Sequence, residues 1–344
     1  MLVRVQSWAP LLGALFLLGC SGSLRDLPVD VHQRCLRCDD QACAAPLDLT
    51  FLGAGGFILQ RGEDTVVIDP FFSNPSVARF LFGRARSDDE TVLRWMPNLP
   101  NASALLVGHA HYDHLLDVPT VARERTPSAR IYASATAKNI LTAAGLADRT
   151  TAVAGWKKGP WKPEKINDRV QFLALHSEHA PHFLGMTFME GEYGTPLTKP
   201  PWFYWRWLEG ETLAFAIDFL AADGSTDFRV LFHDSAAEPN LGMPPTDLPP
   251  ARVRVAIPCV ASFAQVDRYP GHMLYGFAPH YLVLGHWEDF FTPYSQSVDE
   301  VRSVRGTDVG GFLEKLSGYT RENVAMPLPG VTTRITGDCA SAPP

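Results

Sequence analysis

One ten-residue stretch constrains this chain more than any other part of its sequence. Residues 108–117 read GHAHYDHLLD and follow the apolar run ALLV, which is typical of a buried strand. Three histidines and one aspartate lie within six residues here, namely His109, His111, Asp113 and His114. So many ligand-type side chains directly after a buried strand require a fold in which that strand ends at a functional site.

The types and the spacing of these side chains predict a metal site. Imidazole and carboxylate groups together suit zinc and similar first-row ions. His109 and His111 are two residues apart at the end of a strand, so both side chains point the same way and can bind one ion. Asp113 and His114 follow where the chain turns toward a helix, and they can face a second ion. The alternative is a histidine-rich surface loop.

The rest of the chain has the composition of a folded protein, with 46% apolar and 19% charged residues. Most of the expected elements are strands, and helices are inserted between pairs of strands along the chain. This order favours two sheets packed face to face with helices outside. Residues 71–100 include three prolines and are expected to form a loop. Strands are expected at residues 47–52, 57–62, 65–70, 104–109, 130–134, 169–176, 213–219, 228–234, 253–260 and 280–287, and helices at 117–125, 134–145 and 310–319.

The N-terminus predicts export. Residues 1–19 carry one early cation, Arg4, and then an apolar run that is shorter than the roughly 20 residues needed to span a bilayer. This is typical of a signal peptide. LLGC at residues 17–20 resembles a bacterial lipobox, which implies cleavage before Cys20 and a lipid on its sulfur. Ser21 in the next position favours the outer membrane, facing the periplasm. The alternative is a plain secretory signal.

Export makes disulfides the expected state of the remaining cysteines. Cys35, Cys38 and Cys43 cluster in RCLRCDDQAC, and Cys339 lies near the C-terminus. We expect one bridge within the cluster and one from the cluster to Cys339, with Cys259 as a buried free thiol. A structural zinc on the cluster is the alternative.

The charge balance argues against nucleic acid as the main partner. The net charge is −7 and no basic run occurs, whereas binding to a phosphate backbone needs clustered cations. Glycine-rich FLGAGGFIL at residues 51–59 predicts a turn between two strands. It is not a phosphate-binding loop, since no GK[ST] follows.

The motif at residues 109–114 has the pattern HxHxDH and resembles the signature of the metallo-β-lactamase superfamily. The resemblance implies an α/β fold, an αββα sandwich of two mixed β-sheets with outer helices. It implies a catalytic domain at residues 47–325. A tether with the cysteine cluster at residues 20–46 would precede this domain, and a tail at residues 326–344, disulfide-linked through Cys339, would follow it.

The same resemblance implies three further metal ligands at the ends of later strands, in LALHSEH, VLFHDSA and LVLGHWEDF. HSEHAPH offers His176, His179 or His182 as the third histidine. His176 is preferred because it directly ends the strand and a serine follows it. The implied ligands are His109, His111 and His176 for one zinc, Asp113, His114 and His286 for the other, and Asp234 as the bridge between them.

Two Zn²⁺ ions with a bridging hydroxide are the cofactor that this resemblance implies, and other divalent first-row metals fit the same ligands. The expected catalytic residues are Asp113, His179 and His233. His233 stands where the family usually has glycine before the bridging aspartate, Asp234, which makes it a candidate proton donor. His179 and His182 are the other candidates for the acid that protonates the leaving group.

Three further features bear on the site. Asp69, at a predicted strand end, is expected to hold His109 or His111 in the right tautomer. Residues 196–211 carry five aromatics in six positions, which indicates either a core strand or hairpin edge, or an apolar lip that contacts lipid. Residues 267–281 form an aromatic-rich loop that is expected to line the pocket.

The bridging position of Asp234 resembles the branches of the superfamily that act on phosphodiesters, lactones and thioesters. LGHWEDF resembles the end of the N-acyl-phosphatidylethanolamine phospholipase D and lactonase-like branch. The resemblance implies a metal-dependent hydrolase at the bacterial cell envelope. Its expected substrate is a phosphodiester, either a small molecule or a phospholipid, and its lipid anchor is at Cys20. The alternatives are a lactonase or small-ester hydrolase, and a non-catalytic envelope binding lipoprotein.

Overall fold

The computed structural model describes residues 22–24, 27, 29–182, 185–320 and 322–342. The predicted signal peptide at residues 1–19 and the predicted lipid attachment at Cys20 lie outside these residues. Within the described part of the chain, each helix is too short or too polar to cross a membrane.

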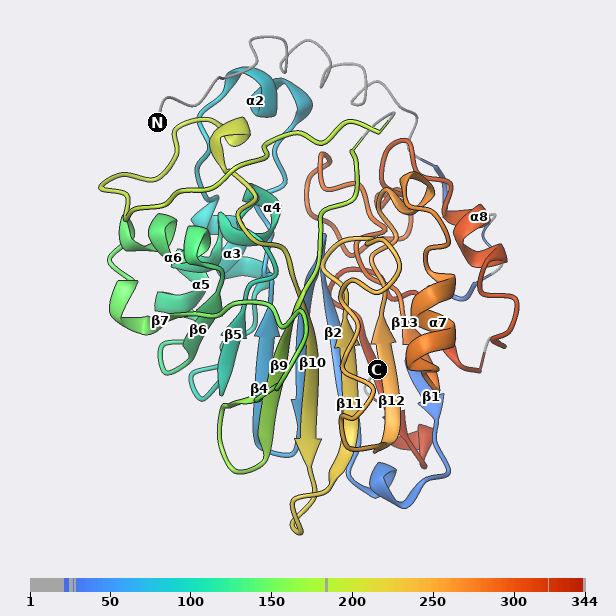
Figure 1. The fold of residues 1–344 in the computed structure, drawn as a ribbon. Coiled ribbons are helices and arrows are strands. Elements are labelled where there is room, and N and C mark those ends of the chain that lie inside the picture. The colour runs from blue at the N-terminus through green and yellow to red at the C-terminus, as the bar shows by residue number, and fades with distance from the viewer. Residues whose placement is uncertain (1–21, 25–26, 28, 183–184, 321, 343–344) are drawn as a thin grey trace.

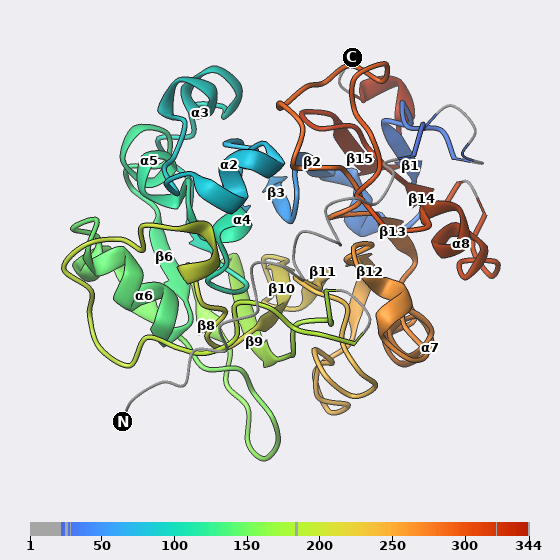
Figure 2. The same cartoon turned by 90° about the horizontal axis from the view of Figure 1, so that it is seen from above.

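Two mixed β-sheets form the centre of the molecule, with helices on their outer sides (Figures 1 and 2). This confirms the predicted αββα fold class. One sheet has the order β1-β15-β2-β3-β4-β5-β6-β7 and the other the order β14-β13-β12-β11-β10-β9-β8. The strands of the first sheet are β1 (Cys35–Arg37), β15 (Thr332–Thr336), β2 (Leu47–Gly53), β3 (Gly56–Arg61), β4 (Asp64–Ile68), β5 (Ala104–Leu106), β6 (Arg130–Ala133) and β7 (Thr150–Ala152). The strands of the second are β14 (Val324–Ala325), β13 (Tyr281–Val283), β12 (Ala251–Ile257), β11 (Thr226–Phe232), β10 (Leu213–Leu220), β9 (Val170–His176) and β8 (Glu164–Lys165).

The side chains of β4 show why its sequence is apolar throughout. Val66 and Ile68 belong to the hydrophobic core shared with the second sheet. Val67 points to the other face and packs in the cluster beneath the outer helices. Because successive side chains of a strand alternate between faces, a strand covered on both sides needs apolar residues at every position. This is why TVVI reads as a continuous apolar run.

The helices occupy the two outer layers. Helices α3, α5 and α6 lie on one side of the sandwich, and α7 and α8 lie on the other (Figure 2). The α-helices are α2 (Val77–Phe82), α3 (Asp89–Trp95), α4 (Tyr112–Leu115), α5 (Val118–Glu124), α6 (Ala135–Thr142), α7 (Gly271–Phe277) and α8 (Val309–Glu314). The short 3₁₀ helices are η1 (Gln41–Ala44), η2 (Ala147–Arg149), η3 (Tyr204–Arg206), η4 (Phe263–Gln265) and η5 (Cys339–Ser341).

The region expected to be a loop, residues 71–100, contains α2 and α3, so that expectation is wrong. Each helix begins at a side-chain cap. The Ser76 hydroxyl accepts a hydrogen bond from the backbone N–H of Arg79, and the Asp88 carboxylate accepts one from the N–H of Thr91. Such caps satisfy donors that a helix leaves unpaired at its start. They allow helices of six and seven residues between the prolines.

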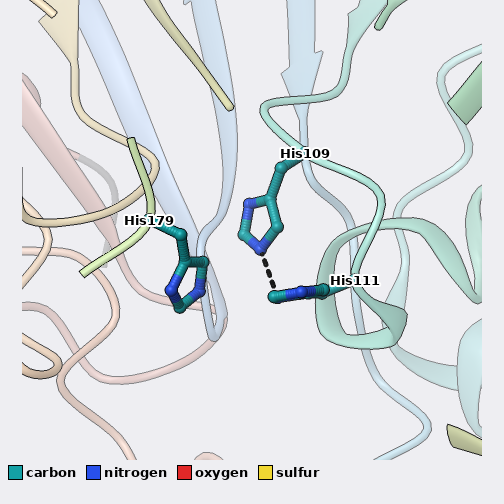
Figure 3. Close-up of side chains that lie close together, drawn as sticks. All are labelled: His109, His111 and His179. Carbon is teal, nitrogen blue, oxygen red and sulfur yellow. Dashed lines mark hydrogen bonds between the residues drawn. The ribbon is translucent and has the colours of Figure 1, made fainter. Parts of the chain in front are cut away.

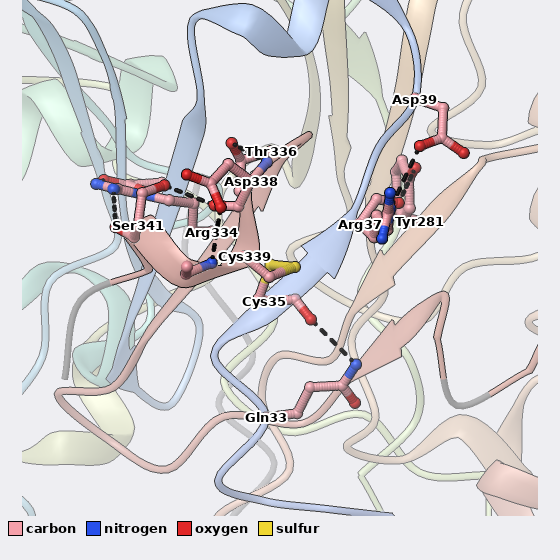
Figure 4. The surroundings of a disulfide bond; sticks show 12 residues. Gln33, Cys35, Arg37, Asp39, Tyr281, Arg334, Thr336, Asp338, Cys339 and Ser341 are labelled. Carbon is pink, nitrogen blue, oxygen red and sulfur yellow. Dashed lines mark hydrogen bonds and ion pairs between the residues drawn. A yellow bond between two sulfur atoms is a disulfide. The ribbon is translucent and has the colours of Figure 1, made fainter.

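Both terminal segments are built into the first sheet rather than lying beside it. β1, from the expected tether, pairs parallel to β15, from the expected tail, and β15 pairs antiparallel to β2. A disulfide joins Cys35 to Cys339 beside this pairing (Figure 4), and a second joins Cys38 to Cys43. The prediction of one bridge within the cluster and one to Cys339 is confirmed. The first sheet thus extends beyond the predicted domain bounds of 47 and 325 on both sides, and the bounds themselves stay a prediction.

Cys259 is a buried free thiol, as predicted. It lies just beyond the end of β12, and burial raises its pKa to about 12. The thiol is therefore protonated at neutral pH and behaves as an apolar core group.

Candidate metal centre

The loops that follow β5, β9, β11 and β13 meet at one end of the sandwich. A backbone hydrogen bond of 2.9 Å from Leu213 N–H to the Gly108 carbonyl joins the two sheets here. Seven histidine and aspartate residues form three overlapping groups at this end, and within each group the ligand atoms lie within 4.8 Å of one another. The groups are His109 with His111 and His179, His109 with His114 and Asp234, and Asp113 with His114 and His286.

The first group has three imidazoles that face one another (Figure 3). His109 Nε2 lies 2.9 Å from His111 Nδ1. The His179 ring centroid lies 4.9 Å from that of His109 and 4.8 Å from that of His111. The Nε2 atom of His111 is buried and has no hydrogen-bond partner among the described residues. An unpaired buried acceptor among three imidazoles is what a divalent cation would satisfy.

His179, and not His176, meets the histidines of the HxHxDH loop. His176 is the last residue of β9, and its Nδ1 atom lies 3.4 Å from a carboxylate oxygen of Glu211. The pairing of β9 with β10 continues past the end of β9, because Ser177 N–H donates to the Thr212 carbonyl. The chain therefore turns into the site three residues later than the sequence suggested. His179 therefore takes the place of His176, the preferred choice from the sequence, as the third histidine of the group.

Asp113, on helix α4, forms a group with His114 and His286, which we call the second group; Asp234 connects it to the first. His114 Nε2 and His286 Nε2 each lie 3.5 Å from Asp113 Oδ2. His286 follows β13 and adopts a left-handed backbone conformation with φ of 53°. Its N–H donates to the carbonyl of Ala54, at 2.8 Å, which holds the loop after β13 against the first sheet. Residues from both sheets thus complete this group.

Asp234 lies between the two groups. Its carboxylate contacts the Nδ1 atom of His109 through one oxygen and lies 2.9 Å from the Nδ1 atom of His114 through the other. Gly108 makes this approach possible, because a Cβ atom at that position would lie 2.2 Å from Asp234 Cγ. The glycine that begins the motif is therefore part of the site. Its position directly before the first histidine is the only sequence signal of that role.

Asp69 supports His114 rather than His109 or His111, which corrects the sequence expectation. Its Oδ2 atom lies 3.1 Å from His114 Nδ1, and its Oδ1 accepts a hydrogen bond of 2.8 Å from Gly108 N–H. Gly55, in the glycine-rich turn, lies against the same ring, since a Cβ there would be 2.7 Å from His114 Cε1. The glycine-rich turn therefore leaves space for the His114 ring.

Burial sets the protonation of the three-histidine group. It lowers the pKa of His109 to about 4 and that of His179 to about 4, and it lowers the pKa of His111 well below its usual value. These imidazoles are therefore neutral at pH 7. A neutral imidazole has a free lone pair, which is the form that binds a metal ion.

The second group carries charge. Burial would raise the pKa of Asp113, but the neighbouring His114 and His286 hold it well below its usual range. Burial would lower the pKa of His114, but Asp234, Asp113 and Asp69 raise it well above its usual value. The carboxylates therefore create a negative potential that draws a positive charge into the group. A bound cation can supply that charge in place of a proton.

His233 does not face the cluster, which corrects its expected role as a catalytic proton donor. Its Nε2 atom is 3.0 Å from the Gly242 carbonyl, and its ring packs near Tyr269 and His272. Adjacent residues at a strand end point to opposite sides, so Asp234 and His233 cannot both face the site. Burial lowers the pKa of His233 to about 4, so the imidazole is neutral at pH 7 and its protonated form is scarce.

His182 is the third histidine of HSEHAPH and borders the first group. Its ring is stacked on that of His179 at 4.4 Å and lies 5.7 Å from that of His111. Its Nδ1 atom accepts a hydrogen bond from Phe188 N–H, so its own proton is on Nε2. His182 therefore offers a donor beside the candidate metal centre.

The two aromatic-rich segments have different places. Within residues 196–211, Tyr204 and Trp207 are buried, whereas 56% of Trp202 is exposed, so the segment is partly core and partly surface. From residues 267–281, side chains between Arg268 and Tyr275 line a separate cavity of about 750 Å³. His272 borders it together with Lys315 of the α8 region. The ligand groups do not line this cavity, so the expectation that the loop lines the pocket of the metal site is wrong.

Comparison with known proteins agrees with this geometry. Residues 64–197 match a family model described as the β-lactamase superfamily domain. The matched segment contains the HxHxDH loop and His179. Residues 64–197 are thus similar to a domain of the metallo-β-lactamase superfamily, and the two mixed sheets with outer helices have the architecture of the metallo-β-lactamase fold. The predicted resemblance is confirmed at this level, and the phospholipase D and lactonase-like branch stays a prediction.

A curated relative is a UPF0173 metal-dependent hydrolase of Pyrococcus furiosus. It is 34% identical to this chain over 131 residues, which are 38% of this chain and 48% of that protein. The chain thus spans about half the length of that relative.

Two solved structures are similar in fold. One is Igni18, a metallo hydrolase from the archaeon Ignicoccus hospitalis, with 17% identity over 84% of this chain and 98% of that one, at a TM-score of 0.49. The other is a possible metal-dependent hydrolase from Veillonella parvula, with 17% identity over 84% and 99% of the two chains and a TM-score of 0.48.

Proposed function

We propose that this protein is a metal-dependent hydrolase that uses two zinc ions, and that it cleaves phosphodiester bonds at the bacterial cell envelope. The observation that carries the proposal is the convergence of two ligand groups on Asp234. His109, His111 and His179 would hold one ion, and Asp113, His114 and His286 the other. Other divalent first-row metals suit the same donors.

When bound, zinc supplies Lewis-acid polarisation of an ester or phosphoryl oxygen and a lowered pKa for water. The chain's own residues keep the ligands in place for this chemistry. Asp69 fixes the orientation of His114 through its Nδ1 atom, which leaves Nε2 for the ion. His109, His111 and His114 are each 1% exposed, so bulk water is excluded from the ligand side of the centre.

His182 is the residue that we assign as hydrogen-bond donor to a substrate oxygen, because burial lowers its pKa well below the usual value and leaves the imidazole neutral at pH 7. Its Nδ1 atom is occupied by the Phe188 N–H, so Nε2 carries the proton. Its ring contacts the three-histidine group, within reach of a substrate placed there. His179, an expected catalytic residue, serves in this proposal as a metal ligand.

Phosphodiesters are favoured over other esters by the paired ligand groups. Two ions at neighbouring sites can stabilise both the attacking and the leaving oxygen of an in-line displacement. A phospholipid substrate agrees with the lipobox-like residues 17–20 and with the partly exposed aromatic segment. The lipid on Cys20 would hold the enzyme beside such a substrate.

The test is metal content and hydrolysis measured together on the form lacking residues 1–20. The substrates are bis(p-nitrophenyl) phosphate, a lactone and an N-acylated phosphatidylethanolamine. We expect about two zinc ions per chain and turnover of the phosphodiesters. Asp113→Ala should lose both the second ion and the turnover.

The matched control is Asp267→Ala, at an aspartate that lies outside all three ligand groups and is 84% exposed in its side chain. It should keep both properties. Turnover of the lactone alone would replace the phosphodiester assignment with a lactonase. A chain that binds no divalent ion would refute the ligand assignment and, with it, the hydrolase.

A further inference from the structure

The surface around helix α2 combines arginines with exposed aromatic side chains. Phe82, at the end of α2, is 82% exposed, and Trp202 is 56% exposed. Arg84 and Arg86 are also exposed, and Arg79 is partly exposed. We call these five residues the α2 face. In both views of the fold, α2 lies next to the short η3 segment that follows Trp202 (Figures 1 and 2).

The arginines of this face enclose a hollow. A cavity of about 320 Å³ is lined by Arg79, Gly83, Arg84 and Arg86. Among the described residues, no ion pair joins these arginines to a carboxylate. The Arg79 guanidinium also donates a hydrogen bond of 3.1 Å to the Arg86 carbonyl. Three arginines beside one hollow suit a phosphate, which can accept several charge-assisted hydrogen bonds from such planar donors.

The acidic residues that follow in the sequence do not neutralise this hollow. The Asp88 carboxylate caps helix α3 at Thr91, and Asp89 accepts a hydrogen bond from the Thr120 hydroxyl. Glu90 forms an ion pair with Arg94, one turn along α3. Each acid makes these contacts away from the hollow, and among the described residues none of them forms an ion pair with an arginine of the α2 face.

The face is held in one arrangement by contacts between its two segments. Ala85 N–H donates a 2.8 Å hydrogen bond to the Trp202 carbonyl. The guanidinium of Arg84 lies 4.2 Å from the centre of the Trp202 ring, a cation–π contact. The arginines and aromatics are therefore presented together, which reduces the ordering cost of binding a ligand.

The same two segments are anchored to the loop of the candidate metal centre. Phe80 of α2 packs on Tyr112 at 5.4 Å, and Tyr204 of η3 packs on Tyr112 at 5.0 Å. Tyr112 stands between His111 and Asp113 in the sequence. A surface that binds the α2 face therefore lies close to the candidate metal centre.

We propose that the α2 face docks on a bilayer that contains anionic phospholipid. The arginines bind lipid phosphates, and Phe82 and Trp202 enter the interface between headgroups and acyl chains, where aromatic side chains are favoured. The net charge of −7 repels such a membrane as a whole, so attraction depends on this local cluster. This proposal rests on the proposed function. It adds that docking places the candidate metal centre at a lipid surface.

The test is co-sedimentation of the form lacking residues 1–20, loaded with zinc, with vesicles. One set is pure phosphatidylcholine and the other contains 30% phosphatidylglycerol, a composition chosen for the assay, at about 0.1 M salt. We expect binding to the anionic set only. Arg84→Ala with Arg86→Ala should weaken it about thirtyfold. Phe82→Ser with Trp202→Ser should weaken it at least about tenfold.

Control variants remove exposed side chains of the same types elsewhere on the surface. Arg252→Ala with Arg268→Ala removes two exposed arginines, and Tyr275→Ser removes an aromatic residue that is 90% exposed. These variants should bind vesicles like the wild type. All variants should keep the wild-type thermal transition and hydrolysis of the soluble bis(p-nitrophenyl) phosphate.

Equal binding to both vesicle sets, no binding to either, or equal losses in the control variants would overturn the docking proposal. So would a dimer in sedimentation velocity that the α2-face substitutions dissociate, since the face would then bind a second copy. Failure of the proposed function gives a different result from failure of the docking proposal. In that case the wild type itself does not hydrolyse the soluble substrate, whatever its binding to vesicles.

Discussion

At the residue scale, His179 and His176 form a matched pair. Both are histidines of one short segment, but only His179 lies with His109 and His111. His176 is held at the end of β9 near Glu211. His179 is therefore a candidate metal ligand, whereas His176 lies outside the candidate ligand groups.

We predict that His179→Ala weakens zinc binding at the first group by more than about 100-fold, because residues that only support ligands already change affinity by about 10- to 100-fold. His176→Ala should change it by less than about threefold. Competition with a chromophoric zinc chelator measures both. The reverse order of the two variants would restore the original assignment of His176.

Asp117 gives a prediction for pH. Its buried carboxylate accepts hydrogen bonds from the N–H groups of Phe72 and Ser73, at 2.7 and 2.9 Å. Burial nevertheless raises its pKa from 3.8 to about 6. The folded protein therefore keeps this proton up to about pH 6, whereas the unfolded chain loses it near pH 4.

The free energy of unfolding should accordingly fall as the pH rises from about 4 to about 6, by up to about 3 kcal/mol from this one group, and then level off. Asp117→Asn keeps an acceptor for the two N–H groups and cannot ionise. Urea unfolding of both proteins at several pH values measures the difference. Identical pH profiles would show that Asp117 does not titrate in this range.

At the element scale, the disulfides act on the strand pair formed by the two ends of the described chain. The bridge between Cys35 and Cys339 closes a loop with a sequence separation of 304, whereas Cys38 and Cys43 are separated by 5. The larger loop has much more chain entropy to lose when it is closed.

We predict that Cys35→Ser with Cys339→Ser lowers the free energy of unfolding by about 2 to 5 kcal/mol, and that Cys38→Ser with Cys43→Ser lowers it by less. Both pairs should bind zinc like the wild type, because none of these cysteines is in the ligand groups. Equilibrium unfolding in urea gives the comparison. A larger effect of the short bridge would contradict this account.

Sequence patterns predicted most of the central strands because those strands are buried on both faces and read as apolar runs. They did not predict α2 and α3, which are too short for a helical period and depend on the Ser76 and Asp88 caps. Nor did they place β1 and β15 in the sheet, because three-residue and five-residue strands acquire stability only from distant partners.

The site was predictable to a similar extent. The HxHxDH loop, Asp234 and His286 come together as expected, since each directly follows a strand of the sandwich. The choice among the histidines of HSEHAPH was not predictable, because backbone pairing beyond β9 sets where the chain turns inward. The outward direction of His233 follows from the alternation of side chains at the end of β11.

At the scale of the whole molecule, the candidate ligands link the two sheets. His109, His111, Asp113 and His114 follow a strand of the first sheet, while His179, Asp234 and His286 follow strands of the second. A bound ion therefore ties both halves of the sandwich together. Because the unfolded chain has no such preformed site, metal binding favours the folded state.

We predict that removing metal with a chelator lowers the thermal midpoint by about 5 °C or more, since an ion at 100 times its Kd stabilises a protein by about 2.7 kcal/mol. Adding zinc back should restore the midpoint. The His179→Ala variant should show a smaller response, which scanning calorimetry resolves. The same midpoint with and without metal in the wild type would mean that no ion links the sheets.

The most direct test of the dinuclear centre is a crystal structure of the zinc-loaded protein with an anomalous difference map recorded at the zinc edge. We expect two peaks, one at His109, His111 and His179 and one at Asp113, His114 and His286, with Asp234 in contact with both. A single peak away from Asp234, or a peak bound by His176 in place of His179, would contradict this expectation.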